Sequence, residues 1–235
     1  MTRRISRARS LAALFVALGC TPSKPSEEPG RVLVIGVDGA EWNMIEPLVA
    51  AGKMPNLRRL MKEGSYGDLE TIEPILSPII WTTIATGREP EDHGVTWFME
   101  RDPKTGATKP VTSRTRKTKA IWNIASSMDR SVGVVGWWAS WPSERVDGWV
   151  ISDHVAAHGF GLTARNVKTE LGRTHPPDLY QSIAPLMVKP SQITDAEIRE
   201  YMDVTEAELA TRRGDTMQFS NPLHHFVFAL SAHKT

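Results

Sequence analysis

The feature that most constrains the fold is a continuous apolar run over residues 31–37, Arg31-Val-Leu-Val-Ile-Gly-Val, which ends at Asp38. A run of β-branched residues that does not alternate with polar ones is typical of a strand buried on both faces of a parallel sheet. We predict further strands at 66–72, 132–136 and 149–152, and helices around 44–49, 55–64, 77–87, 119–128 and 195–212. This order of elements predicts an α/β fold in which helices sandwich a mostly parallel sheet.

Asp38 is the first candidate site residue because it follows the predicted strand directly. In open α/β sheets, ligands bind beyond the carboxyl ends of the strands. A carboxylate at this place is a suitable oxygen ligand for a metal ion. An Asp followed by Gly is also common in simple turns, so the placement of Asp38 matters more than its residue type.

The second candidate is Ser77, which opens the helical segment Ser-Pro-Ile-Ile-Trp-Thr-Thr-Ile-Ala-Thr-Gly87. We predict Ser77 as the N-cap, Pro78 as the first helical residue and Gly87 as the C′ residue. The N–H groups of the first turn would then form an anion site beside the hydroxyl. A serine is a poor nucleophile until its proton is removed, and a metal ion held by Asp38 could do this. The alternative is that Ser77 only caps the helix.

These two segments resemble the type I phosphodiesterase/nucleotide pyrophosphatase family of the alkaline phosphatase superfamily. The likeness rests on Val34-Ile-Gly-Val-Asp-Gly39, on Leu76-Ser-Pro followed by a helix, and on Thr86-Gly-Arg-Glu-Pro-Glu-Asp-His-Gly94. Met54-Pro-Asn-Leu57 also matches, and residues 134–144 and 149–153 resemble later landmarks of a bacterial lipoprotein branch. The resemblance therefore covers residues 31–153.

The resemblance implies that Asp38 is a metal ligand and that Ser77 is both the nucleophile and a ligand of the same ion. It also implies two divalent metal ions, usually zinc, held mainly by Asp-x-x-x-His, Asp-His-Gly and a further His. We find no match for these motifs in residues 1–235. Asp153-His154 is followed by Val155 instead of Gly, and His224, His225 and His233 have no acidic partner at the required spacing. We therefore expect the sequence to be the N-terminal part of a truncated alkaline-phosphatase-like domain, inactive by itself, with most ligands beyond its end.

Two departures from the family pattern narrow the activity. Nucleotide pyrophosphatases carry an Asn three residues after the nucleophile, where this chain has Ile80. Sulfatases of the same superfamily need an Arg that is missing after Ser77-Pro78. The expected reaction is hydrolysis of a phosphate ester through a phosphoseryl intermediate, with mono- and diester substrates both open. The alternatives are a phosphoryl-group transferase and a non-catalytic lipoprotein that uses the fold as a binding scaffold.

The N-terminus predicts export and lipid anchoring. Residues 1–19 combine four Arg with a short apolar run and predict a signal peptide, which is followed by Cys20 in a lipobox-like setting. Residues 20–30 have the composition of a tether, and residues 31–235 would form the incomplete catalytic domain. We expect Cys20 to anchor the protein to a bacterial membrane, on its periplasmic side or at the cell surface. Ordinary signal-peptidase cleavage, with loss of Cys20, is the alternative.

Charge adds little evidence for another partner. Beyond residue 19 the chain has 24 Lys and Arg against 27 Asp and Glu, a formal charge of −3, so nothing signals nucleic-acid binding. The oligomeric state stays open. A basic run at 109–119 could meet an anionic substrate, although a solvated loop fits it better.

Three other groups of residues need a structural as well as a functional interpretation. We interpret His93 as a structural hydrogen-bonding residue of its loop. His154 and His158 could line a site at the end of the 149–152 strand. Trp137, Trp138 and Trp141 fit packing better than a substrate wall.

Overall fold

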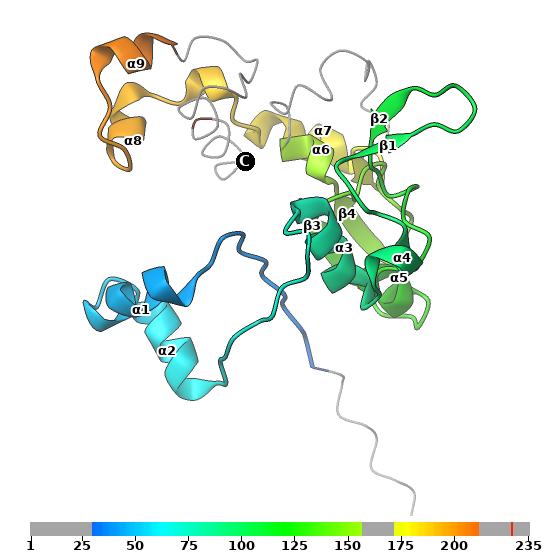
Figure 1. Cartoon of the computed structure of the whole chain (residues 1–235), viewed down its shortest axis with the longest axis horizontal. Helices are drawn as coiled ribbons and strands as arrows, with labels where there is room; N and C mark the ends of the chain where they lie inside the picture. Colours follow the sequence, from blue (N-terminus) through cyan, green and yellow to red (C-terminus); the bar gives the residue numbers. More distant parts are fainter. Residues whose placement is uncertain (1–29, 157–171, 212–226, 228–235) are drawn as a thin grey trace, which may run out of the picture. The chain divides into compact units, whose positions relative to one another are not determined.

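A computed structural model describes residues 30–156, 172–211 and 227, and divides the chain into two compact units, Met1–Asp68 and Leu69–Thr235 (Figure 1). Each unit is described by itself. Cys20 and the predicted signal peptide, together with His158 and His224, lie outside the described residues. Among the residues that are described, no helix is long and apolar enough to cross a membrane.

The described part of the first unit consists of two helices, α1 (Trp42–Ala50) and α2 (Pro55–Glu63). Both begin close to where the sequence predicts them. Pro55 stands in the first turn of α2, where its missing N–H leaves no hydrogen bond unmade, and the Gly64 N–H closes the helix on Leu60 O at 2.8 Å. The Trp42 indole N–H donates to Gly67 O at 3.3 Å, so the chain returns to α1 after α2.

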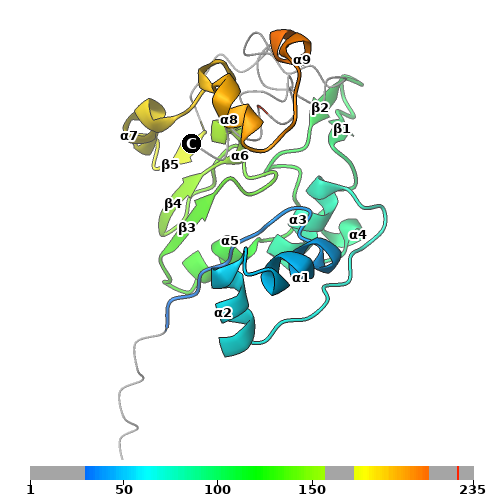
Figure 2. The same cartoon turned by 90° about the vertical axis from the view of Figure 1, so that its left-hand side faces the viewer.

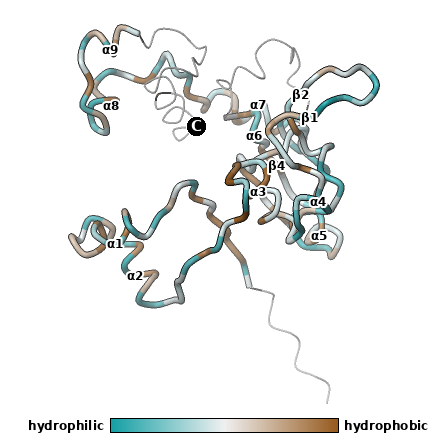
Figure 3. The backbone as a smooth tube through the Cα atoms, in the orientation of Figure 1, coloured by the Kyte–Doolittle hydropathy of each residue, from teal (hydrophilic) through white to brown (hydrophobic). Residues whose placement is uncertain are grey.

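The apolar run at 31–37 does not form the predicted strand, nor does the segment at 66–72. Val32 and Leu33 are 87% and 83% exposed, and the hydrophobic colour of this segment stands out in Figure 3. A strand exists only through hydrogen bonds to a neighbouring strand, and the first unit provides none among its described residues.

The second unit contains a hairpin and a three-stranded sheet (Figure 2). The hairpin pairs β1 (Met99–Arg101) with β2 (Thr108–Pro110). In the sheet, β3 (Val132–Val135) pairs parallel with β4 (Gly148–Ile151), and β4 pairs antiparallel with β5 (Thr174–His175). The mixed α/β class and the parallel β3–β4 pair agree with the prediction. The described residues do not contain a larger sandwiched parallel sheet.

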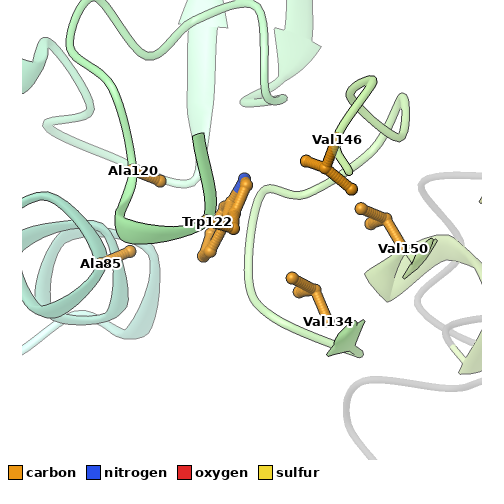
Figure 4. Close-up of a cluster of buried hydrophobic side chains, with 6 residues drawn as sticks. All are labelled: Ala85, Ala120, Trp122, Val134, Val146 and Val150. Atoms are coloured by element: carbon orange, nitrogen blue, oxygen red, sulfur yellow. The ribbon is translucent and has the colours of Figure 1, made fainter. Parts of the chain in front are cut away.

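The unit that contains this sheet also contains four helices: α3 (Ser77–Thr86), α4 (Pro90–His93), α5 (Ile121–Ser126) and α6 (Asp153–Ala156). A core joins α3, α5 and the parallel strands, and Figure 4 shows Trp122 between two alanines and three valines. Its members are Ala85, Ala120, Trp122, Val134, Val146 and Val150. Of the residues of α5, only Trp122 is buried, and Ile121 and Ile124 are 59% and 42% exposed.

The region after β5 is built from short helices around a separate core. These are α7 (Leu179–Ile183), the 3₁₀ turns η1 (Ala184–Leu186) and η2 (Pro190–Gln192), α8 (Asp195–Arg199) and α9 (Glu206–Thr211). Thr194 and Glu197 form a capping box at α8. The neighbouring Ile193 and Ile198 are both buried in the same core. The predicted helix at 195–212 is therefore two short helices.

Candidate functional site

Ser77 is the first residue of α3, a ten-residue helix anchored along one side. Pro78 and Ile79 are buried directly after it, and Ala85 reaches the core near the other end. Gly87 ends the helix in the left-handed region, at φ +61°, as predicted. Ser77 itself is only partly buried, next to these two buried residues.

The predicted cap at Ser77 is wrong by one residue, because Leu76 is the N-cap and has no side-chain cap bond. The Leu76 carbonyl accepts the N–H groups of both Ile79 and Ile80, at 3.0 and 3.1 Å. Pro78 has no N–H to offer. The first turn therefore has fewer free donors for an anion than predicted, and Ser77 contributes its hydroxyl from inside the helix rather than as a cap.

Asp38 lies in an exposed turn at the end of the 31–37 segment, followed by Gly39 at φ +67°. Asp38 belongs to the first unit and Ser77 to the second, so neither unit by itself defines the distance between the two side chains. Within the described residues, neither side chain has a hydrogen-bond partner.

Asp38 and Ser77 each offer an oxygen donor of the kind that suits a divalent ion. No group of three or more His, Cys, Asp or Glu side chains that could hold a metal occurs in residues 30–156 and 172–211. The described residues therefore do not contain a complete metal site.

His93 lies against α3 and fixes it from α4. The Val95 N–H donates to His93 Nδ1 at 3.1 Å, so Nε2 carries the ring proton and donates to Thr83 Oγ1 at 3.0 Å. The side chain is fully buried, and burial lowers its pKa below the ordinary value of 6.5. Both ring nitrogens are engaged, which agrees with a structural interpretation of His93.

The segment between β3 and the next turn, here called the 137–141 loop, is held by Asp153. One carboxylate oxygen accepts the Ala139 N–H and the other accepts the Trp141 N–H, both at 2.9 Å. Ser140 Oγ accepts the Asp153 N–H at 3.0 Å and donates to the Trp137 carbonyl. Burial raises the pKa of Asp153 to about 6, although these hydrogen bonds oppose the shift.

Trp137 connects this loop to the helix that carries Ser77. Its indole N–H donates to Trp81 O at 2.9 Å, and its ring meets the Trp81 and Trp122 rings edge-on, with centroids 5.4 and 6.0 Å apart. Trp138 packs edge-on against Phe98, 5.8 Å away. Trp137 and Trp138 are therefore packing residues in this unit.

The other predicted site residue of this region is His154, whose ring stacks on Trp141 at 4.4 Å with the planes 6° apart. Burial, followed by the charge of Arg173, lowers the pKa of His154 to about 4. The ring is thus neutral over the physiological range. It lies at the end of β4, as predicted, but its described contacts are packing contacts.

Arg116 corrects the interpretation of residues 109–119 as a solvated basic loop. Its side chain is 3% exposed and forms an ion pair with Glu144. Its Nε donates to Thr118 O at 2.9 Å, and its guanidinium lies 5.2 Å from the centre of the Trp122 ring. Arg114 and Lys117 are exposed, as the prediction requires.

Comparison with protein families decides the classification, because the model of the type I phosphodiesterase/nucleotide pyrophosphatase family matches residues 32–217. The chain belongs to this family. It is therefore a member of the alkaline phosphatase superfamily, and the match extends well past the residues on which the resemblance rests. Comparisons with curated proteins and with solved structures gave no match. Family membership supports hydrolysis of phosphate esters, and the family is typically metal-dependent.

Proposed function

We propose that this protein hydrolyses phosphate esters with Ser77 as the nucleophile. The observation that carries the proposal is the position of Ser77 at the head of α3, inside the family segment and with its hydroxyl unengaged by any described residue. The hydroxyl is held on a helix whose next two residues are buried, so its position is set before a substrate arrives.

In the first step, Ser77 Oγ attacks phosphorus, and the bond between phosphorus and the ester oxygen breaks. The leaving alcohol takes a proton, and the product is phosphoserine. In the second step, water attacks the same phosphorus, the bond to Oγ breaks, and phosphate (or a phosphate monoester, from a diester) leaves with the Ser77 hydroxyl restored. A divalent ion, when bound, supplies Lewis-acid chemistry, and Asp38 and Ser77 are the residues of this chain proposed to hold it.

The proposal also covers the location of the protein and its cofactors. We propose that Cys20 anchors it to a bacterial membrane and that residues 20–30 act as the tether. Two zinc ions are the proposed cofactors. Phosphoryl transfer to an acceptor other than water is the main alternative, since the phosphoserine could be attacked by an alcohol.

The decisive experiment measures hydrolysis of p-nitrophenyl phosphate and of bis-p-nitrophenyl phosphate by the complete gene product. Ser77→Ala should lower chelator-sensitive turnover by about a thousandfold or more. Ser131→Ala, an exposed serine of the same unit, is the matched control and should leave turnover unchanged. Equal activity of Ser77→Ala and the parent would remove Ser77 from its proposed role. No hydrolysis by the parent protein with zinc present would favour the non-catalytic scaffold.

A further inference from the structure

We propose that Asp153 is a positioning residue, which holds the 137–141 loop so that Trp137 fixes the helix headed by Ser77. The role assigned here rests on the proposed function of Ser77. The geometry that supports it stands in the second unit alone.

Several hydrogen bonds converge on Asp153. Its two carboxylate oxygens accept two backbone N–H groups of the loop, and its own N–H donates to Ser140 Oγ. A carboxylate that accepts backbone N–H groups makes charge-assisted bonds, which are about twice as strong as neutral ones. The Asp153 side chain thus binds the loop at two backbone positions.

Asp153 also binds a loop residue with an unusual backbone conformation, Ala139. Ala139 lies in the left-handed region at φ +55° and is 3% exposed. A residue with a Cβ is rarely found there, and such strain persists only where the surroundings enforce it. The Ala139 N–H is one of the two groups that Asp153 binds, so the constraint acts on the strained residue directly.

Trp137 connects the 137–141 loop to the helix that begins with Ser77. Trp137 donates to the carbonyl of Trp81, which lies one helical turn after Ser77. The loop therefore contacts the middle of α3, one turn after Ser77, and His93 contacts Thr83 two residues farther along. Release of the loop would remove one of the contacts that hold the helical turn next to Ser77, in addition to the burial of Pro78 and Ile79.

The topology explains why these groups meet. Because β3 and β4 are parallel neighbours, the chain leaves both strands at the same edge of the sheet. The 137–141 loop follows β3, and Asp153 follows β4. Both carboxylate oxygens of Asp153 accept a backbone N–H group of this loop.

The test uses thiol alkylation, which needs no catalytic activity. In a Cys20→Ser background, Ser77→Cys places a single reporter at the head of α3, and Ala120→Cys places another in the core, where the native residue is fully buried. Adding Asp153→Asn should raise the iodoacetamide rate at position 77 by about tenfold, which corresponds to about 1.4 kcal/mol of lost restraint. The rate at position 120 should stay unchanged.

Two further variants make the result decisive. Trp137→Phe keeps an aromatic ring and removes only the indole N–H, and should also raise the rate at position 77. Asp178→Asn is the control, because Asp178 is exposed and its side chain caps no helix. Equal rates at position 77 in the parent, Asp153→Asn and Trp137→Phe would overturn the proposal, as would an equal rise at positions 77 and 120.

A kinetic experiment then links the geometry to the reaction. In the complete gene product, Trp137→Phe should lower kcat and leave KM unchanged, because the nucleophile is displaced while substrate binding is retained. A rise in KM alone would overturn the positioning role. If Ser77→Ala is fully active, the proposed function fails, and the alkylation result still decides whether Asp153 fixes α3.

Discussion

The ion pair of Arg116 and Glu144 should make a large contribution to the stability of the second unit. We predict the effect of Arg116→Met, which keeps most of the side-chain volume and removes the charge. The native guanidinium is 3% exposed and reaches Glu144, Thr118 O and Asn123 Oδ1. Glu144 is 29% exposed and keeps the Trp122 indole N–H as its other donor, at 2.9 Å.

The expected magnitude follows from what the substitution leaves behind. Removing one partner of a buried ion pair costs about 3–5 kcal/mol, because the other charge stays buried without compensation. Glu144 is partly exposed, so water can screen its carboxylate, and we expect about 3 kcal/mol. For a unit of this size, that corresponds to a fall in Tm of about 6–12 °C.

Urea denaturation followed by tryptophan fluorescence measures the loss, with Arg114→Met as the control. Arg114 is two residues away and exposed, so its substitution should change stability by no more than about 0.5 kcal/mol. Glu144→Gln, added to Arg116→Met, should recover part of the loss because it removes the unpaired charge. A cost below about 1 kcal/mol for Arg116→Met would refute the argument, since surface pairs have that strength.

Three further predictions concern titration and capping. The raised pKa of Asp153, about 6, means that its contribution to stability is present below about pH 4 and is lost as the pH rises through 6; Asp153→Asn should flatten that part of the stability curve. The lowered pKa of His93 has the opposite sign, with stability lost as the pH falls below 6.5, and nitrogen NMR should find a neutral ring protonated at Nε2; an Nδ1–H signal would contradict the assignment. Thr194→Ala removes the cap of α8 and should cost about 1 kcal/mol in urea denaturation, with Thr205→Ala at α9 giving a similar loss.

Helices could be predicted from the sequence because their signals are local. The proline near the start of α3 and the glycine at its end act within a few residues. Gly87 lies where the pattern places it, whereas Pro78 is the second helical residue instead of the first. The error of one residue at the N-cap has a specific reason. The Leu76 carbonyl accepts the first helical bond, and a preference for serine at caps does not reveal which carbonyl does so.

Strand pairing could not be predicted from the sequence in the same way. The apolar pattern correctly indicates β3 and β4, but the same kind of pattern at 31–37 forms no strand in the first unit. A helix satisfies its backbone within one segment, whereas a strand needs a second segment whose identity the pattern does not contain. The mixed sheet with antiparallel β5 is also a property of partners and not of any single run.

The role of Asp153 could have been predicted, although residue type points elsewhere. Together with His154, it resembles the metal-binding Asp-His pair of the family motif. By that motif alone, Asp153 would be a ligand of an incomplete metal site. The strand-end rule that singles out Asp38 applies equally to Asp153, because it follows β4 directly. In this case the rule identifies a carboxylate that binds backbone N–H groups of the neighbouring loop.

The hydrogen bonds therefore distinguish polar side chains that hold the fold from polar side chains that have no described partner. His93 uses both ring nitrogens on Thr83 and Val95, and Asp153 uses both oxygens on the 137–141 loop. His93 would have to give up a buried bond before it could bind a metal ion, and an unpaired buried group costs about 1–3 kcal/mol. Asp38 and Ser77 pay no such penalty, because no described residue engages their side chains. An external ligand could therefore reach the Asp38 or Ser77 side chain without first displacing a hydrogen bond from any described residue.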